Sequence, residues 1–405
     1  MSEKKNVPKL RFPEFTEPWE QRKVTDLGEI YIGLVTTMTE HYTDQGHLLI
    51  RNSDIKDGYF EFGENPIYLD EEFSEQNKSR MHQLGDVITV HTGDIGTSAV
   101  IGDNEVNSIG FATIVTRPNQ EVLDSEYFAT YLNTDTHKQW AISMATGDGR
   151  SNYNLKDYTK LVVPIPQIKE QKKIAACIGN LNNLITLHQR KLDHVKDLKK
   201  SMLQKMFPKN GQLYPEVRFP EFTDAWEQRK LGELALFNPK DELPQTFEYV
   251  DLESVVGTEM LSHRTEIKSS APSRAQRLAC TGDIFYQTVR PYQKNNYLFE
   301  ISDNNYVFST GYAQMRPFVD GYFLFSLIQS ERFVKVVLDN CTGTSYPAIN
   351  VNDLAKIEVA VPSGENEAHK IGTIFRSLDH LITLHQRELD HLKLLKKGML
   401  QQMFV

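Results

Sequence analysis

The chain has 405 residues, of which 40% are hydrophobic and 24% charged, so it is long enough for two or three domains with apolar cores. No segment reaches the roughly 20 consecutive apolar residues of a membrane helix, and the first residues, MSEKKNVPKLRF, lack the apolar stretch of a secretion signal. The net charge of −9 does not exclude a nucleic-acid partner, because residues 161–210 carry ten basic and three acidic residues while 1–160 and 211–360 are acidic.

The three cysteines, Cys177, Cys280 and Cys341, lie far apart and form no CxxC pair. An odd number of dispersed cysteines argues against a disulfide framework and against a structural zinc site. The pattern is typical of a protein in a reducing cytoplasm, where we expect this chain to be.

The N-terminal segment opens an internal repeat, because RFPEFTEPWEQRK at 11–23 returns as RFPEFTDAWEQRK at 218–230. The segment LITLHQRKLDHVKDLKKSMLQKMF at 184–207 returns as LITLHQRELDHLKLLKKGMLQQMF at 381–404. Shorter matches lie between these anchors: 85–88 with 282–285, Arg117-Pro118 with Arg316-Pro317, and Asn154 and Asp157 with Asn350 and Asp353. The chain is therefore a tandem repeat of two variable blocks framed by near-identical ends.

The two variable blocks, about 24–160 and 231–358, are predicted to be α+β. Short apolar runs bounded by Gly, Asn and Pro predict strands, which are expected at 86–90, 110–115, 284–289 and 306–309. Helices are fewer and are expected at 125–132, 138–144, 321–330 and 332–340.

Each block is followed by a segment with an apolar residue at every third or fourth position, which predicts a long helix with a coiled-coil seam. The seam residues are Ile174, Ile178, Leu181, Ile185, His188, Leu192, Val195 and Met202 in the first helix, and Ile371, Phe375, Leu378, Ile382, His385, Leu389, Leu392 and Met399 in the second. Pro164 and Pro166 precede the first helix and Pro208 ends it. Some 40 residues would make a rod of about 60 Å.

A helix with such a seam needs a partner, and the other copy in the same chain supplies one. Antiparallel pairing would relate the two units by a pseudo-two-fold axis and place the globular blocks at opposite ends of the rod. Pairing between two chains is an alternative that the periodicity does not exclude.

The sequence lacks the common catalytic motifs GxxxxGK[ST], HExxH and GxSxG, and no GxGxxG follows a strand. The segment TGDIGT at 92–97 lacks the lysine and the helix of a phosphate loop, so we interpret it as a turn. The 12 histidines show no metal-ligand spacing, and His188 and His385 lie on the seam, where packing or a hydrogen bond is expected. We therefore expect no catalytic residue, no cofactor and no metal in this chain.

Two related but diverged blocks on a rigid rod suit a molecule that reads two separated sites on a double helix, whose grooves repeat about every 34 Å. With RFPEFTxxWEQRK, the domain-ending NxxD segments and LITLHQRxLDHxKxLKKxML in both copies, the chain resembles the specificity subunit of type I restriction–modification enzymes over nearly its whole length.

The resemblance implies four parts: a first target-recognition domain at 1–163, a spacer helix at 164–208, a second recognition domain at 209–360 and a second spacer helix at 361–405. It also implies a non-catalytic chain that binds a bipartite, asymmetric DNA site. Such a subunit recruits two modification subunits, which carry S-adenosylmethionine and methylate adenine. Restriction subunits, which use ATP and Mg, then join for ATP-dependent cleavage.

Recognition blocks vary between relatives, so the residues that contact DNA are predicted from residue type alone. Arginine and lysine reach guanine edges and phosphates, and amide side chains pair with adenine. The candidates in the first block are Arg51, Asn52, Ser53, Lys78, Arg80, His91, Thr92, Arg150, Asn152 and Tyr153. Those in the second block are Arg274, Arg277, Gln287, Thr288, Arg290, Tyr292, Lys294, Asn295, Thr344, Ser345 and Tyr346.

Two other classes of function remain open at this point. A coiled-coil scaffold that binds proteins through both blocks would show no salt-dependent DNA affinity. A catalytic chain with an unrecognised site would be active in isolation.

Overall fold

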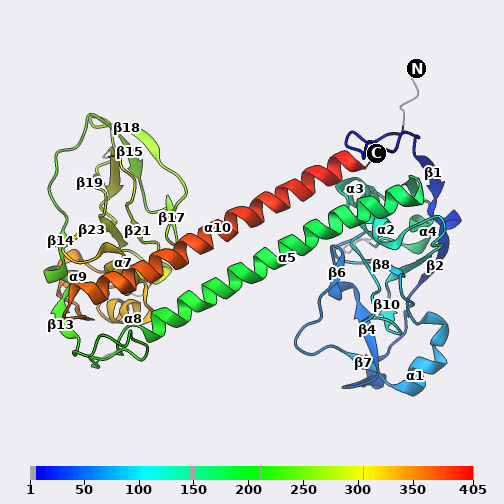
Figure 1. Ribbon diagram of the computed structural model, residues 1–405, viewed down its shortest axis with the longest axis horizontal. Coiled ribbons are helices and arrows are strands. Elements are labelled where there is room, and N and C mark those ends of the chain that lie inside the picture. Colours follow the sequence, from blue (N-terminus) through cyan, green and yellow to red (C-terminus); the bar gives the residue numbers. More distant parts are fainter. Residues whose placement is uncertain (1–5, 146–151, 210, 304, 344, 405) are drawn as a thin grey trace. The chain divides into compact units, whose positions relative to one another are not determined.

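The structure is a computed structural model that describes residues 6–145, 152–209, 211–303, 305–343 and 345–404 (Figure 1). The chain divides into two units, one made of residues 1–187 with 388–405 and the other of residues 188–387. Each unit contains one variable block and a part of each long helix. Among the described residues, no helix combines the length and apolarity needed to cross a membrane.

The first unit contains two small sheets and several helices. Its first sheet has the order β2 (Gly28–Ile32), β11 (Ile114–Pro118), β8 (Val87–Thr89), β9 (Ser98–Val100), all antiparallel. Its second sheet has the order β10 (Ile109–Phe111), β4 (His47–Arg51), β7 (Tyr68–Leu69), β3 (Tyr42–Thr43). Two further pairs join β1 (Glu20–Lys23) to β12 (Val162–Ile165) and β5 (Ile55–Lys56) to β6 (Tyr59–Phe60).

The helices that begin in the first unit are α1 (Glu71–Gln76), α2 (Ser125–Leu132), α3 (Asp135–Met144), α4 (Leu155–Tyr158) and the long α5 (Ile168–Lys205). The cap residues Asp124 and Thr134 accept hydrogen bonds from the backbone at the starts of α2 and α3. Tyr127 and Phe128 of α2 are buried in one hydrophobic core with Trp19, near the chain start, and with Met403 and Phe404. The end of the second long helix, α10 (Glu365–Met403), therefore completes the core of the first block. In Figure 1 its red end lies beside the dark blue N-terminal segment, where the backbone N–H of Leu10 donates to the carbonyl of Gln402.

The second unit repeats this plan. One sheet has the order β14 (Ala235–Phe237), β23 (Tyr312–Pro317), β20 (Ile284–Gln287), β21 (Tyr297–Leu298), and the other β18 (Arg264–Ile267), β15 (Thr246–Val250), β22 (Tyr306–Ser309), β19 (Ala275–Leu278). The remaining strands are β13 (Glu227–Lys230) with β24 (Glu358–Val361), and β16 (Val255–Val256) with β17 (Glu259–Met260). Its helices are α6 (Leu231–Leu234), α7 (Gly321–Gln329), α8 (Glu331–Asp339), α9 (Val351–Lys356) and the long α10 (Glu365–Met403). Among the residues that the structure describes, each unit has one parallel pair of strands, β10 with β4 and β22 with β15.

The predicted α+β class is confirmed, and most predicted elements are present within a few residues. The single strand predicted at 110–115 is wrong, because the chain turns there and forms two strands, β10 and β11, that belong to different sheets. Ala112 makes this turn with a left-handed backbone, at φ 50°, and its carbonyl accepts a hydrogen bond from the side chain of Asn52.

The Gly-Asp and Arg-Pro matches inside the repeat correspond to the same ion pair in both units. The guanidinium of Arg117 pairs with the buried Asp86 at 2.8 Å, and that of Arg316 pairs with the buried Asp283 at 2.9 Å. In each unit this ion pair joins neighbouring strands of the first sheet. In the second unit Asn350 caps α9, because its side chain accepts a hydrogen bond from the backbone of Asp353. These matches therefore preserve the frame of the fold.

The repeated RFPEFTxxWEQRK segment fastens each block to the start of its long helix. In the first unit Arg11 donates two hydrogen bonds to Glu170, at 2.7 and 2.9 Å, and the indole N–H of Trp19 contacts the same carboxylate. In the second unit Arg218 and Trp226 hold Glu367 in the same way, with the two arginine bonds at 2.7 and 2.8 Å. Both carboxylates are buried. We call these three-residue groups the clasps.

Within each unit, a part of α5 packs against a part of α10. In the first unit Ile174 of α5 shares a core with Met403 of α10. In the second, Phe207, just after α5, stacks on Phe375 of α10, and Lys199 pairs with Asp379. The start of one helix thus lies beside the end of the other, which is an antiparallel arrangement.

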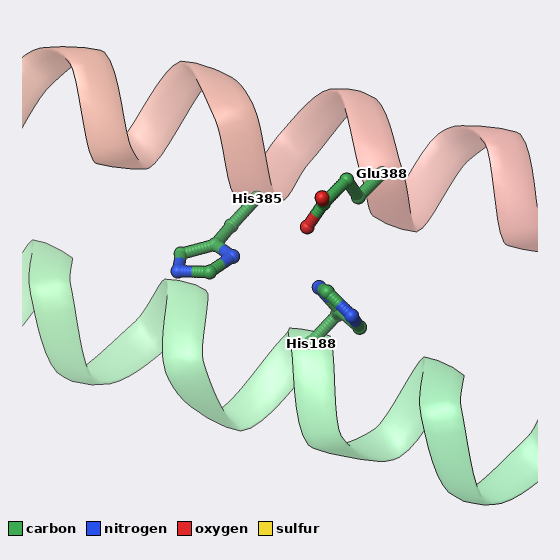
Figure 2. Close-up of side chains that lie close together, drawn as sticks. All are labelled: His188, His385 and Glu388. Carbon is green, nitrogen blue, oxygen red and sulfur yellow. The ribbon is translucent and has the colours of Figure 1, made fainter.

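His188 and His385, the equivalent residues of the two copies, face each other in the second unit (Figure 2). Their ring centroids are 5.6 Å apart and the rings meet edge to face. Glu388, also labelled in Figure 2, follows His385 by three residues on α10. In a pair of antiparallel helices, equivalent residues of the two helices lie opposite each other only at the midpoint of the pair. The contact between His188 and His385 therefore marks this midpoint.

All sixteen predicted seam residues are buried or half-buried.

Candidate nucleic-acid interface

In the first unit the loop after β8 meets the segment that leads into α4. Thr92 and Asn152 form a bridge, and the backbone N–H of Tyr153 donates to the carbonyl of His91 at 2.9 Å. The hydroxyl of Thr92 donates to the amide oxygen of Asn152 and contacts Nδ1 of His91, both at 2.7 Å. Three of the predicted DNA-contacting residues, half-exposed and polar, therefore form one cluster.

Asn52 holds this cluster against the sheet. Its amide oxygen accepts a hydrogen bond from the backbone of His91 at 2.8 Å, and its NH₂ group donates to the carbonyls of Phe111 and Ala112. Both ends of the amide are used inside the fold, so Asn52 positions the loop after β8.

Partial burial lowers the pKa of His91 below its ordinary value. The imidazole is therefore neutral at pH 7 and has one donor and one acceptor nitrogen. The Thr92 hydroxyl donates its hydrogen to Asn152, so Nδ1 of the neutral ring donates to Thr92, and Nε2 is left to accept a hydrogen bond at a base edge without adding a charge.

The other candidates of the first block make local contacts. Arg51 donates to the buried carboxylate of Asp54 at 2.9 and 3.0 Å, and the hydroxyl of Ser53 contacts the same group. Lys78 pairs with Glu75 on the surface, at 3.1 Å. The guanidinium of Arg80 donates to the carbonyl of Ile32 and lies over the ring of Tyr31.

In the second unit the loop after β20 meets the segment before α9 at the equivalent place. Val289 and Ala348 form an isolated antiparallel β-bridge, which is equivalent to the β-bridge between Thr92 and Asn152 in the first unit. The next residue, Arg290, donates its backbone N–H to Pro347 at 2.8 Å, and its guanidinium lies 4.5 Å from the ring centre of Tyr346. The repeat therefore brings the same two loops together twice, with different side chains.

The remaining candidates of the second block surround this point with varying exposure. Lys294 pairs with Glu331 at 2.6 Å, and the amide oxygen of Asn295 accepts a hydrogen bond from the backbone of Gly257. Burial lowers the pKa of the half-buried Arg277 guanidinium below its ordinary value. Arg274, Tyr292 and Ser345 are exposed.

The structure corrects the expectation for three candidates, because Tyr153 is 0%, Gln287 3% and Thr288 7% exposed, which leaves them almost no surface for DNA. The amide of Gln287 donates to the carbonyl of Val289 and to the side chain of Gln293. The hydroxyl of Thr288 donates to the carbonyl of Gly311. These side chains support the loops from inside. Arg150 and Thr344 lie outside the described residues.

Sequence reasoning missed the residues that hold the loops in place. Gln293, whose side-chain oxygen accepts a hydrogen bond from the Gln287 amide, is one that residue type does not indicate. The sequence does carry a signal for the two loops that meet. One loop follows a strand that begins after a repeated Gly-Asp, and the other precedes a helix that begins at a repeated Asn-x-x-Asp, so the loops occupy equivalent positions in the two copies.

Comparisons with known proteins place this fold in a family. The family model for the type I restriction modification DNA specificity domain matches the chain twice, at residues 16–197 and 224–394. The inferred MjaX type I restriction enzyme specificity subunit of Methanocaldococcus jannaschii is 22% identical and is matched over 97% of this chain and 94% of its own length. The MjaVIII type I restriction enzyme specificity subunit of the same organism is also 22% identical, over 79% of this chain and 78% of its own length.

A solved structure has the same fold. The crystal structure of the type I restriction-modification system S subunit from M. genitalium matches with a TM-score of 0.64 at 15% sequence identity. The match covers 98% of this chain and 99% of that chain.

Proposed function

The chain belongs to the family of type I restriction–modification DNA specificity domains, which it carries twice, and we propose that it reads a bipartite, asymmetric DNA site, one half with each unit. Members of this family are recognition subunits without catalytic activity. One observation carries the proposal: the same two loops meet at the same place of both units, but with different side chains.

A shared frame with different contacts supports two different half-sites. The strand order of the antiparallel four-stranded sheet, the Asp–Arg ion pair and the clasp recur in both units. The meeting loops carry His91, Thr92 and Asn152 in the first unit, but Arg290 and Tyr346 in the second. Imidazole, hydroxyl and amide groups match other base edges than a guanidinium does, so the two halves of the site would differ in sequence.

The long helices would set the distance between the two half-sites. We divide the chain into recognition domains at 1–163 and 209–360 and spacer helices at 164–208 and 361–405. The contacts between α5 and α10 inside each unit support an antiparallel coiled coil along their whole length. A rigid spacer fixes the gap between the half-sites.

Exposed leucines on the long helices supply docking surfaces for the modification subunits. Leu184, Leu187 and Leu198 on α5, and their equivalents Leu381, Leu384 and Leu395 on α10, are each 39% to 45% exposed. Repeated apolar side chains on helices are typical of protein contacts. Because each set occurs twice, two copies of one partner would bind. These modification subunits would carry S-adenosylmethionine for adenine methylation, and restriction subunits with ATP and Mg would join them in the cytoplasm.

The test is genome-wide mapping of methylated adenine in cells with the gene, without it, and with it restored. We expect a two-part motif with an unspecified gap that disappears with the gene and returns with it. A protein scaffold, the alternative function, would leave the methylation pattern unchanged.

A fragment of about residues 1–210 is expected to form a homodimer that reads a palindrome. Because the two helices carry the same seam, a second copy of α5 can take the place of α10. The homodimer should be weaker than the intact chain, since Asp379, which pairs with Lys199, corresponds to Asn182 in the first copy. Sedimentation equilibrium and binding to a palindromic oligonucleotide of the first half-site measure both properties. A folded fragment that stays monomeric at tens of micromolar would contradict the pairing.

A further inference from the structure

The loop after β20 has an unusual backbone at two residues that carry positive charge. Arg290 and Lys294 are both left-handed, at φ 54° and φ 55°, and they flank the short 3-10 turn Pro291–Gln293. Side chains other than glycine rarely adopt this conformation, and it persists only where surrounding contacts hold it. Such residues cluster at binding sites, so the contacts that hold Arg290 are informative.

Several hydrogen bonds fix Arg290 from both sides. Its backbone N–H donates to the carbonyl of Pro347. Thr288, two residues before Arg290, accepts a hydrogen bond at its carbonyl from the backbone N–H of Ile349. The buried amide of Gln287 donates to the side chain of Gln293, which closes the turn from inside. The position of Arg290 is therefore set by the core of the block.

The guanidinium of Arg290 lies over the ring of an exposed tyrosine. Its central carbon is 4.5 Å from the ring centre of Tyr346, and Tyr346 is 64% exposed. Gly343, at φ 85°, makes the turn that leads to Tyr346, and a Cβ there would lie 3.0 Å from the Tyr346 carbonyl. The turn at Gly343 therefore helps to hold the aromatic ring of Tyr346 against the guanidinium of Arg290.

We propose that Arg290 reads a guanine in the half-site of the second unit and that Tyr346 positions it. A guanidinium offers two parallel N–H donors that match the O6 and N7 acceptors of guanine in the major groove. A ring stacked against the guanidinium restricts its rotation and leaves the donor edge open. The inference rests on the proposed function, because it assigns a base to the second of the two units that would recognise the half-sites.

The first unit supplies an internal control. At the equivalent bridge it has Thr92 and Asn152, and the loop 91–96 contains no arginine. The first half of the motif should therefore not depend on Arg290. A change confined to the second half would separate a base contact from a general loss of stability.

The experiment expresses the full chain with its modification subunits and maps methylated adenine for wild type, Arg290→Ala, Arg290→Lys, Tyr346→Ala and Tyr346→Phe. Arg290→Ala should relax one guanine of the second half to any base and leave the first half unchanged. In competition between oligonucleotides, its preference for guanine at that position should fall about 10- to 100-fold. Arg290→Lys should lose most of the preference too, since an ammonium cannot make the two parallel bonds.

The tyrosine variants test the positioning role. Tyr346→Phe keeps the ring and should keep the guanine preference, while Tyr346→Ala should weaken it less than Arg290→Ala does. The matched control is Arg229→Ala, which removes an arginine of the same unit whose guanidinium lies near Glu233. This control should leave both halves of the motif intact.

Each outcome decides between named alternatives. If Arg290→Ala retains every guanine of the second half, or if it changes the first half as much as the second, the assignment is wrong and the proposed function stands. If Arg290→Ala abolishes methylation, the oligonucleotide competition decides, because retained guanine preference overturns the assignment. If wild type yields no bipartite motif, the proposed function itself fails.

Discussion

Replacing Ile185 by proline is expected to abolish methylation while both blocks remain folded. Ile185 lies inside α5, which runs without interruption from Ile168 to Lys205. Proline removes one backbone hydrogen bond and clashes with the preceding turn, which costs about 3 kcal/mol or more inside a helix. A break in α5 would change the distance between the two blocks that contact DNA, so the complex would no longer match a site whose half-sites are separated by a fixed gap.

The measurement combines methylation in cells with circular dichroism of the purified chain. Ile168→Pro is the matched control, because the first helical position needs no intrahelical partner for its N–H and tolerates proline. We expect the control to methylate normally. Normal methylation by Ile185→Pro would rule out the helix as a spacer.

Removing the carboxylate of a clasp is expected to cause the largest loss of stability. Glu170 and Glu367 are 0% and 2% exposed, and each accepts two hydrogen bonds from an arginine and one from a tryptophan. Glu170→Ala or Glu367→Ala would leave a largely buried guanidinium without its partner, which costs about 3–5 kcal/mol. Denaturant unfolding of the intact chain measures the free energy.

Glu14 provides the control for the clasp. Its carboxylate pairs with Lys173 on the surface, and that lysine lowers the pKa of Glu14. Exposed ion pairs are screened by solvent and contribute little to stability, so Glu14→Ala should lower the free energy of unfolding far less than Glu170→Ala does. Equal losses from Glu14→Ala and Glu170→Ala would show that burial of the clasp does not matter.

The sequence was sufficient for the features that depend on local pattern. The repeat, both long helices and strands such as Tyr306–Ser309 follow from periodicity and composition, which neighbouring residues determine. The exception at 110–115 has a physical reason, since an apolar run looks continuous even where Ala112 turns the chain into another sheet.

Features that depend on distant partners could not be predicted. The clasp pairs Arg11 with Glu170, which are 159 residues apart, and nothing in their neighbourhoods indicates the partner. Gln287 and Arg290 are three residues apart and equally polar, yet one is buried beneath the loop and the other lies against Tyr346. Residue type predicted that this loop contacts DNA, while the tertiary structure decides which of its side chains are available.

Site-specific photo-crosslinking tests the central claim that each unit reads one half of the site. A photoreactive residue replaces either Thr92 or Tyr346 in the full complex, bound to DNA that carries the complete motif. We predict that crosslinks from position 92 lie only in one half of the motif and those from position 346 only in the other. Crosslinks from both positions in the same half, or only in the gap between the halves, would contradict the account.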